Sequence, residues 1–251
     1  DGLWMSNDQG ATWTNVLTTP VDAVAVDPVN PAVAYAGTGY GQVFRTADSG
    51  GQWTDVTGNL NAGQINTLAV NPAQNAHILV GGFNGIGGSM TSGTQWTVQQ
   101  AGMVSTAISG ISADPGSDRI YFSVPTAGVY YESGGSGTAL PVNNGGLLTL
   151  AYPNTTFDIS AMLAQPGGLW VSQAPWIENS TDGGNTWSAQ RFEPSGPDQF
   201  FAMASPAGVP QTVMGAAISG LYRTTNGGAA WAPVSAGIPA ASVISRLLTA
   251  P

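Results

Sequence analysis

The sequence predicts an all-β protein, a β-propeller of six blades with four antiparallel strands in each blade. Three observations lead to this fold class. An eight-residue pattern with a central glycine and a final tryptophan recurs along the 251 residues. An apolar run that ends in proline recurs in register with it, and the segments between are short and strand-like. Units of about 40 to 47 residues that each hold four short strands are typical of propeller blades.

The repeated pattern has the form Ser/Thr-x-Asp/Asn-x-Gly-x-x-Trp. Clear copies occupy residues 6–13, 46–53, 180–187 and 224–231. Two further copies are eroded: residues 90–96 are one residue short, and residues 133–140 keep the spacing but end in Leu140. The regular spacing of these copies predicts one pattern in each blade.

The second landmark gives the order of strands in a unit. Apolar runs end at Pro28, Pro72, Pro115, Pro153 and Pro206. In the first unit we expect strands over residues 21–26, 33–36, 43–45 and 53–56, with turns at the Asp-Pro and glycine-rich segments between them. The unit that starts at Pro153 has about nine extra residues, which we assign to residues 166–179. They form either a loop between its second and third strands or a loop beside the repeated pattern.

The two ends of the chain share the sixth blade in this prediction. Residue 1 enters at a third strand, and residues 245–251 supply a first strand. Either this blade lacks its second strand, or the chain belongs to a longer protein. We expect residues 1–251 to form a single propeller domain.

These repeats resemble Asp boxes, also called bacterial neuraminidase repeats, over nearly the whole chain. Similar repeats occur in sialidases, xyloglucanases, the sortilin ectodomain and photosystem II assembly factors. The resemblance implies an Asp-box propeller, but it selects no single function.

In a hairpin of this kind the acidic or amide side chain accepts backbone N–H groups, the glycine allows a positive φ, and the tryptophan packs beneath the turn. Equally spaced copies spread over the blades and cannot converge on one site, so we interpret them as structural and not as catalytic groups or calcium ligands. The residues in this role are Asp8, Trp13, Asp48, Trp53, Asp182, Trp187, Asn226 and Trp231.

Composition excludes several functions. The chain has no cysteine, one histidine, and 14 acidic against five basic residues, all of them arginines, which gives a net charge of −9. Thiol chemistry and multi-histidine metal sites are excluded, and nucleic acid is a poor partner for so acidic a chain. No apolar run reaches the length of a membrane span. We expect no cofactor, no metal, no membrane insertion, and an extracellular or periplasmic location.

Two carboxylates are the weak candidates for catalysis. Asp22 and Asp198 lie near the start of a predicted first strand, where a glycosidase pair could form, but a polar lining of the channel explains them equally well. His77 lies in a predicted turn, and we expect it at the surface, which leaves no Ser-His-Asp triad. A sialidase site is not expected, because its Arg-Ile-Pro signature is missing and the adjacent Tyr131 and Glu132 would point to opposite faces of a strand.

In a repeat protein a binding site is expected where one unit differs from the others. The candidate ligand-binding residues are Trp176, Trp170, Glu178, Tyr40 and Phe83. Trp176 has no counterpart in other units, whereas Trp170 can also be a core residue equivalent to Trp4. The sequence therefore predicts a non-catalytic module that binds a glycan or a protein surface through loops on one face. The alternatives are a glycoside hydrolase with paired carboxylates and an assembly scaffold in a larger complex.

Overall fold

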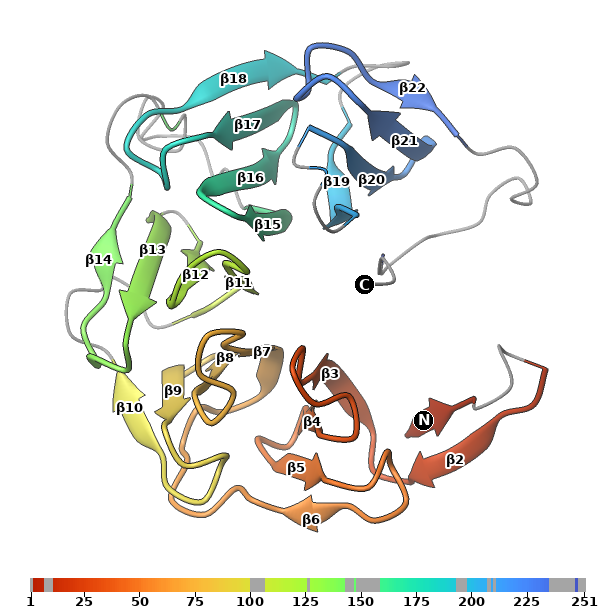
Figure 1. The fold of residues 1–251 in the computed structure, drawn as a ribbon, viewed down its shortest axis with the longest axis vertical. Coiled ribbons are helices and arrows are strands. Elements are labelled where there is room, and N and C mark those ends of the chain that lie inside the picture. Colours follow the sequence, from red (N-terminus) through yellow and green to blue (C-terminus); the bar gives the residue numbers. More distant parts are fainter. Residues whose placement is uncertain are drawn as a thin grey trace. The chain divides into compact units, whose positions relative to one another are not determined.

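In the part of the chain that the structure describes, all regular secondary structure is β-strand. This computed structural model describes residues 2–6, 11–99, 107–125, 127–142, 147, 159–192, 198–206, 209, 211–234 and 247. The strands form five four-stranded sheets and one two-stranded sheet, and neighbours in each sheet follow chain order (Figure 1). Such meanders are the blades that the sequence predicts.

The strands are numbered along the chain. The two-stranded sheet holds β1 (Leu3–Met5) and β2 (Thr14–Leu17). The next sheet holds β3 (Val21–Val26), β4 (Ala34–Thr38), β5 (Val43–Thr46) and β6 (Thr54–Asp55). It is followed by β7 (Ile65–Val70), β8 (Ile78–Gly82), β9 (Gly85–Ser89) and β10 (Thr97–Gln99). The central sheet holds β11 (Gly110–Ala113), β12 (Arg119–Val124), β13 (Gly128–Ser133) and β14 (Leu140–Pro141). The last two sheets hold β15 (Ala161–Gln165), β16 (Gly168–Gln173), β17 (Trp176–Ser180) and β18 (Ser188–Arg191), and then β19 (Phe200–Ala204), β20 (Val213–Ala217), β21 (Gly220–Thr224) and β22 (Ala232–Pro233).

The chain divides into two compact units. The first comprises Asp1–Phe122 with Tyr131–Leu140, and the second comprises Ser123–Tyr130 with Pro141–Pro251. The first unit contains the sheets from β1 to β10, and the second contains the sheets from β15 to β22. The central sheet contributes residues to both units.

Neighbouring sheets pack closely because glycines let side chains of the next sheet reach the backbone. Ile65 at the start of β7 lies against Gly37 of β4, where a Cβ atom would stand 2.4 Å from its Cγ2. Ile108 makes the same contact with Gly81 of β8, where a Cβ would stand 2.5 Å from Cγ2. Ile65 and Ile108 are both fully buried. A larger residue at either glycine would push the sheets apart.

The repeated pattern forms the turn between the third and fourth strands of a sheet. Thr46 Oγ1 accepts the N–H of Gly50 at 3.0 Å, and Asp48 Oδ1 accepts the N–H of Gln52 at 2.9 Å. Ser49 and Gly50 both have positive φ, +58° and +86°. The same two side-chain acceptors recur in the turns after β17 and β21, through Ser180 with Asp182 and Thr224 with Asn226.

The turn after β9 is a full-length copy and not one residue short, as the sequence suggested. It begins at Ser89, whose Oγ accepts the N–H of Gly93 at 2.9 Å. Thr91 takes the place of the aspartate, and its Oγ1 accepts the N–H of Gln95 at 3.0 Å. A hydroxyl therefore replaces the carboxylate, which hid the pattern.

The tryptophans of these turns differ in burial, contrary to the common anchoring role that the pattern predicts. Trp96 is 4% exposed and donates to the carbonyl of Val56 at 2.7 Å, and Trp187 donates to the carbonyl of Val142 at 2.9 Å. Trp13 is 60% exposed, so its anchoring role is wrong. It follows a pattern whose Asp8 lies outside the described residues. The indole N–H groups of Trp96 and Trp187 therefore tie their turns to the preceding connection, whereas those of Trp53 and Trp231 are buried without an acceptor among the described residues.

The ends of the chain are described only in part. The β1–β2 sheet supplies a third and a fourth strand, as predicted. Of residues 245–251, the predicted first strand, only Leu247 lies among the described residues. It packs against a cluster of Ala202, Ala216 and Leu221 in the last sheet.

Candidate functional site

The turns between the second and third strands carry exposed aromatic side chains in the first unit. Tyr40 lies between β4 and β5 and is 78% exposed, and Phe83 lies between β8 and β9 and is 58% exposed. Thr38 Oγ1 accepts the N–H groups of Tyr40 and Gln42 and so shapes the first turn. Because β3 and β7 contact each other, these turns belong to adjacent sheets.

Polar side chains lie beside these aromatic turns. Asp22 Oδ2 is 3.4 Å from the donor Gln64 Nε2, and a Cβ at Gly39 would stand 2.8 Å from the same carboxylate oxygen. Asn84 follows Phe83, and its side chain lies beside Gly63. We define the turn surface as Tyr40, Phe83, Asp22, Gln64 and Asn84. It combines exposed rings with a carboxylate and two amides.

The two candidate catalytic carboxylates have different surroundings. Asp22 is exposed, whereas Asp198 is 8% exposed. Asp198 Oδ1 accepts the N–H of Gln199 at 2.8 Å, and Oδ2 accepts the N–H of Ser219 at 3.1 Å and also its hydroxyl. These bonds tie the start of β19 to the turn before β21. Asp22 belongs to the first unit and Asp198 to the second.

Residues 166–179 do not contain the extra residues that the sequence predicted there. β15 ends at Gln165, Pro166 and Gly167 form the turn, and β16 and β17 follow with only Ala174 and Pro175 between them. The first strand of this sheet is thus marked by Gln165-Pro166 and not by Tyr152-Pro153. The extra chain precedes β15, since residues 142–160 connect β14 to β15 and residues 56–64 connect β6 to β7.

The three candidates in that segment lie in a sheet and not in a loop. Trp170 is 4% exposed on the second strand β16, whereas Trp4 is 54% exposed on β1, so the two are not equivalent. Trp176 is partly buried at the start of β17, beside the Ala174–Pro175 turn. Glu178 is fully buried and accepts a hydrogen bond from Gln173 Nε2. Trp176 is the one of the three that borders a turn between second and third strands.

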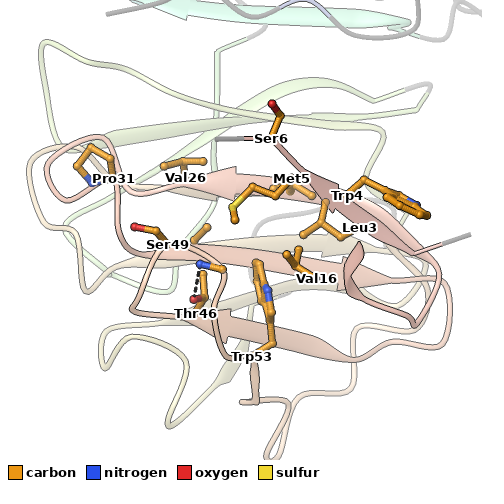
Figure 2. Close-up of a pocket in the computed structure, with 13 residues that line it drawn as sticks. Leu3, Trp4, Met5, Ser6, Val16, Val26, Pro31, Thr46, Ser49 and Trp53 are labelled. Carbon is orange, nitrogen blue, oxygen red and sulfur yellow. Dashed lines mark hydrogen bonds between the residues drawn. The ribbon is translucent and has the colours of Figure 1, made fainter. Parts of the chain in front are cut away.

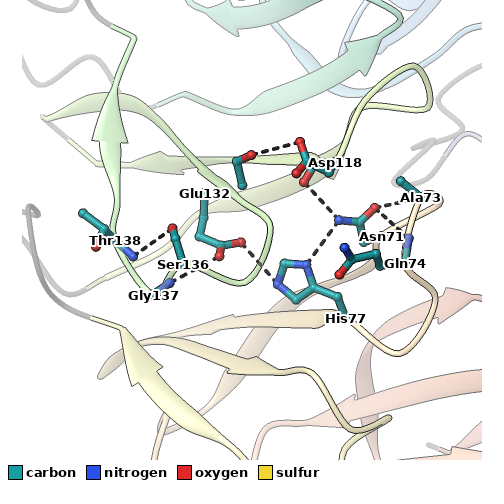
Figure 3. Close-up of polar contacts among 10 residues, drawn as sticks. Asn71, Ala73, Gln74, His77, Asp118, Glu132, Ser136, Gly137 and Thr138 are labelled. Atoms are coloured by element: carbon teal, nitrogen blue, oxygen red, sulfur yellow. Dashed lines mark hydrogen bonds and ion pairs between the residues drawn. The ribbon is translucent and has the colours of Figure 1, made fainter.

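His77 is buried, so the prediction of a surface histidine is wrong. Its Nε2 lies 3.2 Å from Glu132 Oε2, but the two groups are not aligned as a hydrogen bond (Figure 3). Its Nδ1 lies 3.2 Å from Asn71 Nδ2. Asn71 Oδ1 accepts the N–H groups of Ala73 and Gln74, which fixes the amide with Nδ2 toward the ring. The imidazole therefore accepts at Nδ1 and carries its proton at Nε2, toward Glu132.

Sequence reasoning missed this pair because the two residues lie far apart in the chain. His77 occupies the position before β8 where Val33 stands before β4, and Glu132 occupies the position on β13 where Arg45 stands on β5. The signal was the paired departure of a histidine and a glutamate from their counterparts in other repeats.

An apolar groove of about 370 Å³ lies between the β1–β2 sheet and the β3–β6 sheet (Figure 2). Met5, Val16 and Trp53 line it, together with Val24 and Val26 of β3, which are 47% and 55% exposed. The counterparts on β7, Leu68 and Val70, are 7% and 5% exposed. The groove is therefore lined by a face of β3 whose counterpart on β7 is buried.

The aspartates of the repeated turns are held in the ionised form. Hydrogen bonds from Thr186, first through its hydroxyl and then through its N–H, lower the pKa of Asp182 to about 2. The N–H of Gln52 and the hydroxyl of Thr46 lower the pKa of Asp48. Carboxylates of this kind are committed to the turn and are poor proton donors at neutral pH.

The described part of the chain offers neither a cluster of metal ligands nor a membrane-spanning helix. No group of three or more His, Asp or Glu side chains there could hold a metal ion. None of these residues forms a helix with the length and apolar character of a membrane span.

Burial raises the pKa of Tyr121 and Tyr130, so both phenols are neutral at neutral pH.

Comparisons by sequence found no matching family model and no matching curated protein. Comparison by structure found β-propellers. The GH74 xyloglucanase from Xanthomonas campestris superposes with a TM-score of 0.71 at 20% identity, over 92% of this chain and 42% of the enzyme chain. The extracellular domain of a one-component system from B. thetaiotaomicron gives 0.73 at 12% identity, over 98% of this chain and 33% of that chain. YCF48 bound to D1 peptide gives 0.64 at 18% identity, over 91% of this chain and 73% of that chain.

The chain thus spans less than half of the xyloglucanase to which it is similar. Identities this low carry the fold and not the activity. The sheet order and these superpositions together confirm the predicted fold class, and the chain is a β-propeller.

Proposed function

We propose that this propeller is a binding module that recognises a protein partner through the turn surface. The observation that carries the proposal is the exposure of Tyr40 and Phe83, 78% and 58%, in equivalent turns of adjacent sheets. Exposed aromatic rings on rigid turns offer a large contact area at low cost in conformational entropy. Asp22, Gln64 and Asn84 supply hydrogen-bonding groups beside them.

The charge of the chain and one structural neighbour favour a protein over a glycan. The net charge of −9 favours a partner with basic residues. YCF48, a structural neighbour, is described bound to a peptide. A scaffold role in a larger complex is the same kind of interaction and predicts co-purification with a protein.

The turn surface can be tested with a peptide library. Peptides selected on the wild-type protein are expected to combine an aromatic or aliphatic residue with Arg or Lys. Tyr40→Ser with Phe83→Ser should weaken their binding by at least about tenfold, since each ring is an exposed anchor. Val29→Ser is a matched control, because Val29 is 64% exposed in a turn at the other end of its sheet. Selected peptides that bind the double variant as tightly as wild type would overturn the proposal.

A glycan is the second candidate, because rings beside amides also suit sugar binding. A glycan array would show it as binding that depends on Tyr40, Phe83 or Trp176. A glycoside hydrolase is the third, and an activity screen on array hits would show it as product release that is lost in Asp22→Asn or Asp198→Asn. The hydrogen bonds of Asp198 support a structural role for that residue.

We also propose the finer assignments that go with this function. The repeated turns are Asp boxes, since three of them share the two acceptors and the positive φ values described above. Residues 1–251 form one propeller domain, and the protein works in an extracellular or periplasmic location. Extracellular chains among the structural neighbours support that location.

A further inference from the structure

The β15–β18 sheet differs from its neighbours in the turn after its first strand. Residues 27–33 connect β3 to β4, and residues 71–77 connect β7 to β8. Each of these turns accepts an N–H from the turn after the third strand, as Ala32 does from Ser49, and the turn between β15 and β16 keeps this bond through Gly167 and Gly183. Between β15 and β16 only Pro166 and Gly167 remain. The shorter turn fills less space at this end of the sheet.

A cavity of about 350 Å³ lies at this short turn, entirely within the second unit. The turn itself, Gln165, Trp170 and the end of β17 form one side of the cavity, and Gln211 and Gly227 of the next sheet belong to the other. Cavities that bind small ligands start at about 300 Å³. The volume is therefore suited to a ligand of one ring.

Trp170 fixes the orientation of the side-chain amide of Gln165, a residue that lines the cavity. The indole Nε1 donates to Gln165 Oε1 at 3.1 Å, and an indole N–H cannot accept, so the amide oxygen must face the ring. This orientation leaves Gln165 Nε2 buried, and it has no acceptor among the described residues. Burial of an amide donor without an acceptor is unfavourable, so a ligand oxygen would relieve a real cost.

The indole is held rigidly in place. Trp170 meets Trp231 edge to face, with ring centroids 6.0 Å apart. Gly228 brings its backbone so close that a Cβ would stand 2.9 Å from the ring atoms Cη2 and Cζ3 of Trp170. A ring fixed on both sides is a preorganised apolar wall.

The remaining lining is neutral and polar. Asn179 and Gln211 contribute amides, Ser180 and Thr181 contribute hydroxyls, and none of the residues lining the cavity is charged. A ligand that suits it has an apolar face, several neutral polar groups and no charge. A pyranose ring has this combination, with C–H groups on its face and hydroxyls around its edge.

We propose that the cavity of Gln165 and Trp170 binds the ring of a neutral sugar, with a sugar oxygen accepting the Gln165 Nε2 donor. The site lies at the end of β15 and β16 opposite to the Ala174–Pro175 turn, so it is separate from the turns between second and third strands. Among the described four-stranded sheets it belongs to the one with the shortest first turn, two residues against five to eight in the others. This agrees with the rule that a repeat protein binds where one unit differs from the rest.

The test uses ¹⁵N-labelled protein titrated with D-glucose, N-acetylglucosamine and, as the anionic comparator, D-glucuronate. A single ring is expected to bind with a Kd of about 1 mM or weaker. At least one neutral sugar should shift the Trp170 indole and Gln165 amide signals in a saturable way, and glucuronate should bind more weakly. No saturable shift with either neutral sugar, or equal binding of glucuronate, would overturn the proposal.

Three variants locate the binding. Thr181→Phe fills the cavity from its exposed rim without touching the Gln165–Trp170 bond, and it should abolish the shifts. Gln165→Glu keeps the acceptor for Trp170 but removes the donor, so binding should weaken about tenfold. Gln74→Glu makes the same chemical change at an exposed position between β7 and β8, outside both the cavity and the turn surface, and should leave sugar binding unchanged. Shifts that survive in the folded Thr181→Phe variant refute the site, whatever the peptide library shows.

Discussion

The side chains of Asp48, Asp182 and Asn226 make the same hydrogen bonds in their turns, although two are carboxylates and one is a neutral amide. Each side chain accepts a backbone N–H four residues further on and a hydroxyl hydrogen two residues before it. The amide of Asn226 shows that the turn needs an acceptor oxygen at this place, not a negative charge. The charge of the aspartates matters for the pH dependence of stability instead.

Asp182 should therefore make the protein more sensitive to acid. Its pKa in the folded protein is about 2, and an unfolded aspartate has a pKa of about 3.9. A lowered folded pKa gives stability that is present above about pH 4 and is lost as the pH falls toward about 2. Asp182→Asn should lose less stability than wild type between these values. Urea unfolding at several pH values measures this, and parallel curves for the two proteins would contradict it.

Gly184 and Gly167 test strain and close packing separately. Both have positive φ, +93° and +69°, but a Cβ at Gly184 would stand 2.6 Å from Val142 Cβ, while nothing lies within 4 Å of the Gly167 position. Gly167→Ala should cost about 1 kcal/mol through φ alone. Gly184→Ala should cost about 3 kcal/mol, because overpacking is added. Equal losses in chemical unfolding would show that packing against Val142 is unimportant.

At the scale of elements, polar side chains link one sheet to the next near the turns after first strands. Asn75 Nδ2 donates to Asp27 Oδ2 at 3.0 Å, between the β3–β6 and β7–β10 sheets. Asn71 Nδ2 donates to the carbonyl of Asp118 at 3.0 Å, between the β7–β10 sheet and the central sheet. The His77–Glu132 pair joins the same two sheets within the first unit.

Glu132 also supports the turn after β13, which is the most degenerate copy of the pattern. In that copy Ser133 donates to Asp118 Oδ1 at 2.9 Å. Glu132 Oε1 instead accepts the N–H of Gly137 at 3.3 Å, a bond made by the pattern's own hydroxyl in other copies (Figure 3). The buried carboxylate thus connects His77 to a turn that has lost its usual acceptor.

The His77–Glu132 pair is expected to contribute strongly once either partner is removed. Glu132→Ala or His77→Ala should each cost about 3 to 5 kcal/mol, since the remaining polar group stays buried without its partner. The double variant His77→Ala with Glu132→Ala should cost less than the sum of the two single losses, because removing both partners leaves neither of them buried without the other. A double-mutant cycle in urea measures the coupling. Additive losses would mean that the two side chains do not interact.

Element boundaries follow from the sequence where local chemistry sets them. The proline landmark and the repeated turn predicted the β3–β6 sheet closely, because glycine, proline and aspartate act on their own backbone. The prediction failed at Pro153, where another apolar run before a proline imitated the landmark and Gln165-Pro166 was passed over. An apolar residue before a proline does not show whether the strand ending at Tyr152 or the strand ending at Gln165 pairs with the next strand of the sheet.

At the scale of the whole molecule, the acidic balance governs partners. With a net charge of −9 and five arginines, the chain offers few cations for phosphates. We expect DNA binding weaker than a Kd of about 10⁻⁴ M at physiological salt, the weak end of non-specific binding. Fluorescence anisotropy with a labelled duplex measures this, and saturable binding that weakens with salt would contradict it.

The candidate site was only partly accessible to sequence reasoning. Tyr40 and Phe83 were found because glycine-rich turns between strands are exposed in any sheet protein. Glu178 and Trp170 were also named as ligand residues. Glu178 is fully buried on β17, whereas Trp170, 4% exposed on β16, lines the cavity beside the shortened turn. His77 was expected at the surface, and its burial depends on Glu132, a residue of another sheet.

The sequence by itself determined the class of fold, the repeated turns and the scarcity of histidine and cysteine as catalytic groups. These features depend on composition and on contacts between residues close in the chain. Only the tertiary structure decided which side chains are buried, where the irregular sheet departs from the others, and that the departure is a shortened turn with a cavity beside it. The reason is physical: burial and cavities arise where separate sheets pack, and the residues that meet there carry no fixed spacing in the sequence.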